Sequence, residues 1–187
     1  MGEPDFQPVL DGELVRLRPL KPDDWAQLYA VASDPLIWEV HPQRERYKEE
    51  VFREFFDAAL DCGKALVILD RRTGDIIGSS RYYNYDPDRS EVEIGWTFLA
   101  RKYWGGTFNR EVKRLMLDHA FRFVGTVIFS VAQSNLRSRR AMEKIGGVLR
   151  SADRDRASED GPIPPLVFEI RKREAPSVGL PTRKSPE

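Results

Sequence analysis

The stretch Ser90–Phe123, which reads SEVEIGWTFLARKYWGGTFNREVKRLMLDHAFRF, decides the fold. Its first part has an apolar residue at every second position, which is the period of a β-strand. The apolar positions are Val92, Ile94, Trp96 and Phe98, and between them lie Glu91, Glu93, Gly95 and Thr97. We therefore expect Glu91 and Glu93 on one face of this strand, a face that is either exposed to solvent or functional.

The second part of the stretch has the period of an amphipathic helix. Its apolar stripe consists of Val112, Leu115, Met116, His119, Ala120 and Phe123. Between strand and helix lies the turn Trp104-Gly105-Gly106-Thr107-Phe108-Asn109. The first N–H groups of a helix have no internal partner and carry partial positive charge, so a glycine turn at this point can bind phosphate. The same two glycines could also serve only as a tight turn.

The chain lacks the sequence patterns of two common phosphate-binding classes. Neither the P-loop pattern GxxxxGK[ST] nor the dinucleotide pattern GxGxxG occurs in it. Two histidines and a single cysteine, Cys62, show no metal-ligand spacing, so we predict no metal site.

Length and composition indicate one globular domain. The 187 residues are 41% hydrophobic, and 30 basic side chains balance 30 acidic ones. Zero net charge gives no reason to expect a nucleic acid or an anionic membrane as partner. One cysteine fits a reducing compartment, and no segment reaches the roughly 18 apolar residues of a membrane span. We expect a cytoplasmic protein.

Periodicity also divides the remainder of the chain. We expect a loose N-terminal arm at 1–12, one domain at 13–173 and a disordered tail at 174–187. Besides the central strand, strands are expected at 14–20, 65–70, 76–85, 126–132, 148–150 and 166–171. Besides the central helix, helices are expected at 22–32, 46–60 and 136–145, and an exposed loop at 153–165.

This order of elements predicts an α/β (α+β) fold with a mixed sheet. Three successive strands joined by short turns favour antiparallel pairing, whereas the later strand–helix–strand unit favours a parallel crossover. The sheet should therefore be mostly antiparallel, with about seven strands and about four helices.

Two motifs resemble the GCN5-related N-acetyltransferases (GNAT), and in particular the branch of the ribosomal-protein alanine N-acetyltransferases. The segments EIGW, YWGG and NREVKRLML are similar to that branch's EIGYW strand and WGxGxxxEA turn and helix. Downstream, Asn135-Leu136-Arg137-Ser138 and Glu143-Lys144-Ile145-Gly146 resemble its N-x-x-S-x-x-x-x-E-K-x-G pattern. The resemblance covers residues 12–172.

The resemblance implies an acyltransferase that uses acetyl-CoA, with parallel strands that splay where the cofactor enters. It further implies direct transfer of the acetyl group to a primary amine in a ternary complex. The amine would belong to a protein N-terminus or to a small molecule, without nucleic acid or membrane as partner. Exposed aromatic residues would allow a homodimer, which nothing in the sequence requires.

The resemblance also assigns catalytic roles. Glu93 matches the proposed general base and Ser138 the proposed general acid, while Glu91 could be a substitute base or attract the amine. Many acetyltransferases outside this branch have a tyrosine where this chain has Met142. Both assignments have structural alternatives, because Glu93 could be a solvent-facing strand residue and Ser138 could belong to a helix cap.

The remaining site residues surround the cofactor and the amine. The cofactor site would comprise Trp96, Thr97, Phe98, Trp104, Gly105, Gly106, Thr107, Phe108, Asn109, Asn135 and Ser138. The acceptor pocket would comprise Trp38, His41, Tyr83 and Glu91. Basic residues around the turn could contact phosphate or form a solvated surface; they are Arg101, Lys102, Arg110 and Lys113.

The turn departs from the family's R/Q-x-x-G-x-G/A pattern. Thr107 occupies the place of the second glycine and Asn109 that of the next small residue. Gly105 and Gly106 could restore the needed backbone freedom one residue earlier. This departure and the missing tyrosine leave a second hypothesis open, namely a module that binds and senses acyl-CoA with little or no catalysis.

Overall fold

The computed structural model describes residues 4–150 and 164–173. The tail expected at 174–187, and nearly all of the loop expected at 153–165, lie outside the described residues. None of the helices in the described part is long and apolar enough to cross a bilayer.

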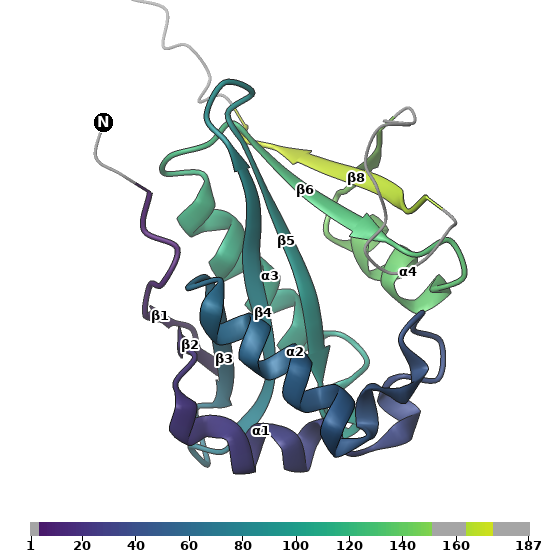
Figure 1. The fold of residues 1–187 in the computed structure, drawn as a ribbon. Coiled ribbons are helices and arrows are strands. Elements are labelled where there is room, and N and C mark those ends of the chain that lie inside the picture. The colour runs from purple at the N-terminus through teal and green to yellow at the C-terminus, as the bar shows by residue number, and fades with distance from the viewer. Residues whose placement is uncertain (1–3, 151–163, 174–187) are drawn as a thin grey trace, which may run out of the picture.

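The described residues form one mixed sheet with helices on both faces (Figure 1). The strands are β1 Leu10–Asp11, β2 Val15–Pro19, β3 Ala65–Asp70, β4 Ile76–Asp86, β5 Glu91–Leu99, β6 Thr126–Val131, β7 Val148–Leu149 and β8 Leu166–Arg171. The α-helices are α1 Trp25–Ala32, α2 Glu49–Asp61, α3 Thr107–Ala120 and α4 Leu136–Lys144. Short 3-10 helices are Pro22–Asp24, Pro35–Ile37, Arg44–Tyr47 and Arg101–Tyr103.

The strand order confirms the predicted mixed sheet. It runs β1-β2-β3-β4-β5-β6-β8-β7, and in the described part only β5 and β6 pair in parallel. Among the described residues the sheet has eight strands instead of the expected seven or so, because β1 adds a short strand at its edge.

The N-terminal residues that the structure describes do not form the loose arm that we expected. Leu10 and Asp11 pair with β2, opposite Leu17 and Arg16. Upstream, the ring of Phe6 packs against Tyr82, Tyr85 and Phe123, with ring centroids 5.4–5.8 Å apart. A two-residue strand and one anchoring aromatic leave no periodic signal, which explains the wrong boundary.

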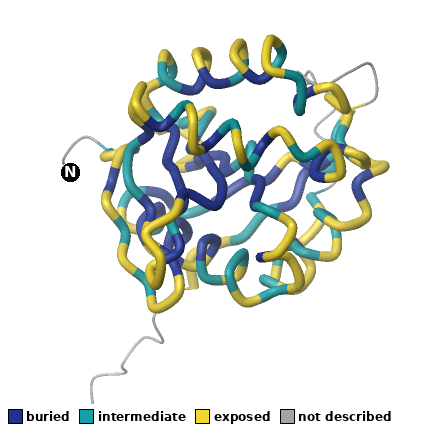
Figure 2. Tube along the Cα trace, turned by 90° about the horizontal axis from the view of Figure 1, so that it is seen from below, coloured by how far each residue is buried: buried dark blue, intermediate teal, exposed yellow. Residues whose placement is uncertain are grey.

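Two hydrophobic cores lie on the two faces of the sheet. One lies between the sheet and α3 and includes Tyr82, Val92, Ile94 and Met116. The other lies under α1 and α2 and includes Leu28, Phe52 and Phe56. Figure 2 shows the buried part of the trace in the middle of the molecule, with exposed turns around it.

The strict alternation expected along β5 is wrong after Gly95. Ser79 on β4 lies opposite Phe98, but Arg81 lies opposite Gly95, so β5 holds one extra residue. Trp96, in this bulge, has a positive φ of 51°. A one-residue bulge exchanges the faces of all later side chains. Phe98 therefore packs under α1 and α2, whereas Ile94 packs against α3.

The parallel pair separates soon after it forms, as predicted. Glu91, Val92 and Glu93 pair with Thr126, Val127 and Ile128, and no later residues of β5 and β6 are paired. Beyond this point β6 stays paired with β8 up to Val131, so the two halves of the sheet diverge (Figure 1).

Candidate active site

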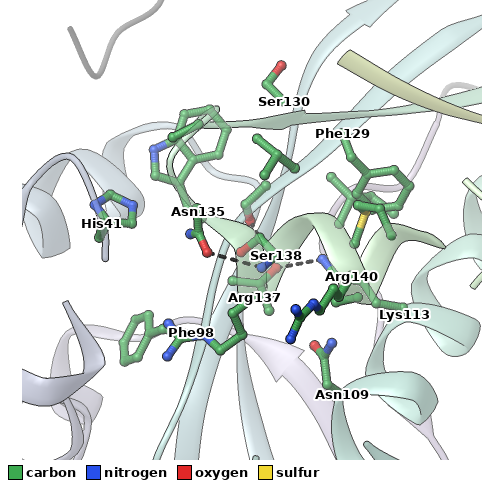
Figure 3. Close-up of a pocket in the computed structure, with 18 of the residues that line it drawn as sticks. His41, Phe98, Asn109, Lys113, Phe129, Ser130, Asn135, Arg137, Ser138 and Arg140 are labelled. Atoms are coloured by element: carbon green, nitrogen blue, oxygen red, sulfur yellow. Dashed lines mark hydrogen bonds between the residues drawn. The ribbon is translucent and has the colours of Figure 1, made fainter. Parts of the chain in front are cut away.

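A cavity of about 700 Å³ opens where β5 and β6 separate (Figure 3). It is lined by β5, β6, the start of α3, α4 and the segment between α1 and α2. Of the residues proposed from the sequence, it brings together Trp38, His41, Tyr83, Glu93, Trp96, Thr97, Phe98, Trp104, Gly105, Gly106, Asn109, Asn135 and Ser138. Glu91, Thr107 and Phe108 are not among its lining residues.

Glu93 lies in the cavity wall and is buried, with only 5% of its surface exposed. The alternative of a solvent-facing strand residue is therefore wrong. Asn84 donates a hydrogen bond from Nδ2 to Oε2 of Glu93 over 3.1 Å. Tyr83, opposite Glu93 on β4, packs edge-on against Trp96 at 4.8 Å between ring centroids. This carboxylate is thus held in a largely apolar wall.

Glu91 is buried on the same face but has a structural contact instead of a place in the cavity. Its Oε1 lies 3.0 Å from Nη1 of Arg150, whose Nε lies 3.6 Å from Oε2 of Glu169 on β8. The ion pair joins β5 to Arg150, the residue that follows β7. The structure therefore does not bring Glu91 to the site as a second carboxylate.

The glycine turn gives α3 an open N-terminus. Gly105 and Gly106 have φ values of 100° and 142°, a region that side chains with a Cβ rarely adopt. Gly106 is the N-cap of α3, and within 4–150 and 164–173 no side chain caps this end. Added Cβ atoms at both glycines would meet nothing within 4 Å, so the backbone conformation, not space, requires glycine.

Residues around this turn divide between the cavity and the core. Trp104 donates from Nε1 to the carbonyl of Leu99 over 2.9 Å, and the guanidinium of Arg137 lies 3.8 Å from its ring centroid. Phe108 packs against Tyr103 at 4.8 Å between centroids, and the side chain of Thr107 is exposed. Hence the position where the family pattern has its second glycine lies at the rim.

The start of α4 forms the opposite wall of the cavity. Oδ1 of Asn135 accepts a hydrogen bond from the N–H of Ser138 over 3.0 Å, so Asn135 is the N-cap. Ser138 therefore belongs to this cap through its N–H, in line with the structural alternative, while Asn135 supplies the capping oxygen. One turn later, buried Met142 also lines the cavity.

The four basic residues near the turn do not form one ring. Arg101 pairs with Asp34, and Nζ of Lys102 lies 4.8 Å from the ring centroid of Tyr103. Arg110 is exposed at the cavity, while Lys113 is only 4% exposed. Only the last two therefore belong to the site.

Lys113 is the functional candidate whose environment the sequence analysis missed. Its Nζ donates to Oγ1 of Thr97 over 2.7 Å and lies 5.1 Å from the ring centroid of Phe129. Burial lowers the pKa of Lys113 to about 7. The helical period could have revealed its burial, because Lys113 precedes Met116 by three residues and Ala120 by seven.

The segment between α1 and α2 closes the cavity on the side of Glu93. Trp38 is buried, donates to the carbonyl of Ala32 over 2.7 Å and packs against Phe98 at 5.1 Å between centroids. Nδ1 of His41 accepts from the N–H of Gln43 over 3.0 Å. Burial, together with the charges of Arg46 and Arg137, lowers the pKa of His41 to about 3. The imidazole is therefore neutral at pH 7.

A mixed sheet that opens between two parallel strands, next to an uncapped helix start, is the architecture of the acyl-CoA N-acyltransferases. The family model described as "Acetyltransferase (GNAT) domain" matches residues 15–148. The chain belongs to this family and is an acetyl-CoA-dependent acyltransferase.

Solved structures extend the match over most of the chain. A putative acetyltransferase from T. thermophilus is 26% identical, with a TM-score of 0.73 over 89% of this chain and 90% of the other. RimJ from Mycobacterium smegmatis, in complex with CoA-disulfide, is 18% identical, with a TM-score of 0.65 over 84% and 81%. Spermidine N-acetyltransferase from Vibrio cholerae, with CoA and spermine, is 17% identical, with a TM-score of 0.64 over 86% and 96%. No curated protein matches the sequence.

Proposed function

We propose that this protein moves an acetyl group from acetyl-CoA to a primary amine by direct transfer in a ternary complex. The observation that carries the proposal is one continuous cavity that holds both the open start of α3 and the buried carboxylate of Glu93. A donor with its phosphates at one end and its thioester at the other would reach from the first to the second.

The chain has suitable groups for the donor along this path. Backbone N–H groups at the start of α3, beside Gly105 and Gly106, would bind the pyrophosphate. Arg110 and Lys144 also line the cavity and would face phosphate charge. Oδ1 of Asn135 is used by the cap, which leaves its Nδ2 to donate to the pantetheine arm. The residues present therefore fit acetyl-CoA.

Glu93 would remove a proton from the acceptor amine, directly or through one water. An amine must be neutral to attack a carbonyl carbon, and a carboxylate fixed by Asn84 is a suitable base. Since Glu93 faces the side of Trp38, His41 and Tyr83, the acceptor would enter from there. Neutral His41 would help to form the wall of this pocket.

The acceptor would be a protein N-terminus or a small-molecule amine. The related structures include an enzyme named for spermidine and one described as a putative ribosomal-protein-serine acetyltransferase, both from Vibrio cholerae. A first screen should therefore offer peptides with free N-termini next to polyamines and amino acids, with CoA release as the readout.

The variant Glu93→Gln tests the mechanism. It keeps the shape of the side chain but removes the base, so kcat/KM should fall by about 10²–10³. The shift of the melting temperature on adding CoA should persist, because Glu93 lies away from the start of α3. Asp118→Asn, an exposed change on α3, is the matched control. Unchanged kcat/KM in Glu93→Gln would rule out this base; CoA binding without transfer to any amine would favour the sensing module.

A further inference from the structure

Lys113 is a buried cation with few partners in the part of the chain that the structure describes. An ammonium group can donate three hydrogen bonds, and the one recorded for Lys113 goes to a hydroxyl, that of Thr97. Among the described residues no carboxylate pairs with it, and burial is the cause that lowers its pKa. Burying a charge without a counter-charge is costly. Because Lys113 lines the cavity, a group that enters the cavity can complete its contacts.

The position of the Lys113 ammonium is fixed by the bulge of β5. Oγ of Ser80 donates to the carbonyl of Gly95 over 3.3 Å, and it lies 2.7 Å from Oγ1 of Thr97. This chain of hydrogen bonds ties α3 to β4 and β5 at the point where β5 leaves β6. Figure 3 shows Lys113 among the side chains that line the cavity, together with Asn135 and Ser138 from the start of α4.

Lys113 and Glu93 approach the cavity from opposite faces of the sheet. Val92 and Ile94 pack against α3, so Glu93 between them faces the side of α1 and α2. Lys113 comes from α3 itself and meets Thr97, which follows Glu93 by four residues. Four residues of strand span about 13 Å, enough for an amine, the acyl carbon and a sulfur between the two side chains. The amine enters on the Glu93 side, which leaves the sulfur on the side of Lys113 and the α3 start.

We propose that Lys113 protonates the sulfur of the departing CoA, an inference that rests on the proposed function. As the amine nitrogen bonds to the acyl carbon, the amine proton goes to Glu93. The bond between carbon and sulfur then breaks, its electron pair goes to sulfur, and a proton moves from Nζ of Lys113 to that sulfur. The products are the acetylated amine and the CoA thiol, and exchange with solvent restores both side chains. Lys113 would thus take the role that the resemblance implies for Ser138, and Met142 cannot supply this proton.

The environment suits a proton donor at neutral pH. A lysine with the ordinary pKa of 10.5 would release its proton reluctantly, whereas Lys113 has a pKa of about 7. The groups packed against it, Thr97 and Phe129, do not titrate in this range. Charged residues elsewhere in the lining are Glu93 on β5, Arg110 on α3, Arg46 before α2, and Arg137, Arg140 and Lys144 on α4.

The acidity of the leaving group tests the inference. Transfer to an amine from the screen would be compared for acetyl-CoA and for its selenium analogue, whose selenolate leaves without needing a proton. The proteins compared would be the wild type, Lys113→Met and Arg114→Met, an exposed control on the same helix. With acetyl-CoA, Lys113→Met should be much slower than the other two, whereas with the selenium analogue all three should react at similar rates. An equal loss of rate in Lys113→Met with both donors would overturn the inference.

The pH dependence of turnover adds a second readout. With an amine from the screen, Lys113→Met should lower kcat about 10²-fold. The wild-type kcat should decline as pH rises above about 7, and this decline should be absent from Lys113→Arg, since an arginine keeps its proton. A wild-type kcat and pH profile in Lys113→Met would contradict the role. If CoA does not shift the melting temperature of the wild type, the proposed function itself fails, and that result is obtained first.

Discussion

Two charged side chains that lie two residues apart on α3 have opposite surroundings. The carboxylate of Glu111 accepts hydrogen bonds from the N–H groups of Glu13, Leu14 and Val15 at 2.7–2.9 Å. Burial disfavours this charge, but the three bonds hold the pKa of Glu111 below its ordinary value. Lys113, on the other side of the helix, has one hydroxyl partner and a lowered pKa. The Glu111 carboxylate thus has three hydrogen-bond donors within the fold, whereas the Lys113 ammonium has one acceptor among the described residues.

The same contrast separates two regions of the molecule. Away from the cavity, Asp70 accepts from the hydroxyl of Tyr103 and from the N–H of Arg72, both over 2.8 Å. Its burial is outweighed by these bonds, and its pKa is lowered, so the charged form is favoured. In the cavity wall, Lys113 and His41 have pKa values shifted toward their neutral forms. The ionisable groups in the cavity wall therefore contribute less to the stability of the fold than the well-bonded carboxylates elsewhere in the domain.

The largest effect is expected at Glu111. Glu111→Ala removes one acceptor of three backbone N–H groups at the β1–β2 turn, and we expect it to lower the free energy of unfolding by about 2–3 kcal/mol. The lowered pKa means that Glu111 stabilises the fold above its unfolded pKa of 4.5, and that this is lost as pH falls through the folded value. Urea unfolding at pH 7 and pH 3 measures both effects. If Glu111→Ala were destabilised relative to the wild type by the same amount at pH 7 and at pH 3, this role of the Glu111 charge would be contradicted.

A gain in stability is expected at Lys113. Lys113→Met keeps the apolar length and removes the buried charge, so at pH 6 the protein without ligand should gain about 1–2 kcal/mol. The folded pKa of about 7 lies below the unfolded 10.5, so wild-type stability rises between these values. The advantage of the variant should therefore shrink as pH rises toward 10. Melting curves across this range measure it; a loss of stability at pH 6 would show that the ammonium is structurally satisfied.

The smallest effect is expected at His41. Its folded pKa of about 3 lies below the unfolded 6.5, so stability is complete above pH 6.5 and declines as pH falls toward 3. Because the ring is only partly buried, we expect the free energy of unfolding to be lower by about 0.5 kcal/mol at pH 5 than at pH 7. His41→Gln should lack this decline, and unfolding at pH 7 and pH 5 would detect it. If His41→Gln loses as much stability between pH 7 and pH 5 as the wild type does, groups other than His41 cause the decline.

The sequence predicted the order of elements and most of the cavity, since both depend on local patterns. Periodicity located β5 and α3, and the two motifs placed Glu93, Asn135 and Ser138 at one site. The bulge could not be predicted, because it is defined by the register with β4. The ion pair of Glu91 with Arg150 was missed for a similar reason, since the two residues lie 59 positions apart. The cap by Asn135, three residues before Ser138, was accessible from the sequence.

The bulge of β5 makes one residue of this strand dispensable for the two cores. Deleting Trp96 would restore the plain alternation and remove an unfavourable positive φ. Phe98 would stay under α1 and α2 and Leu99 would stay among the residues around α3, because the bulge has already exchanged the faces of the side chains that follow it. The loss of Trp96 would therefore alter only the cavity wall where β5 leaves β6. The loss of one residue elsewhere in the strand would turn the side chains on one side of that point to the opposite face, so such deletions should be selected against.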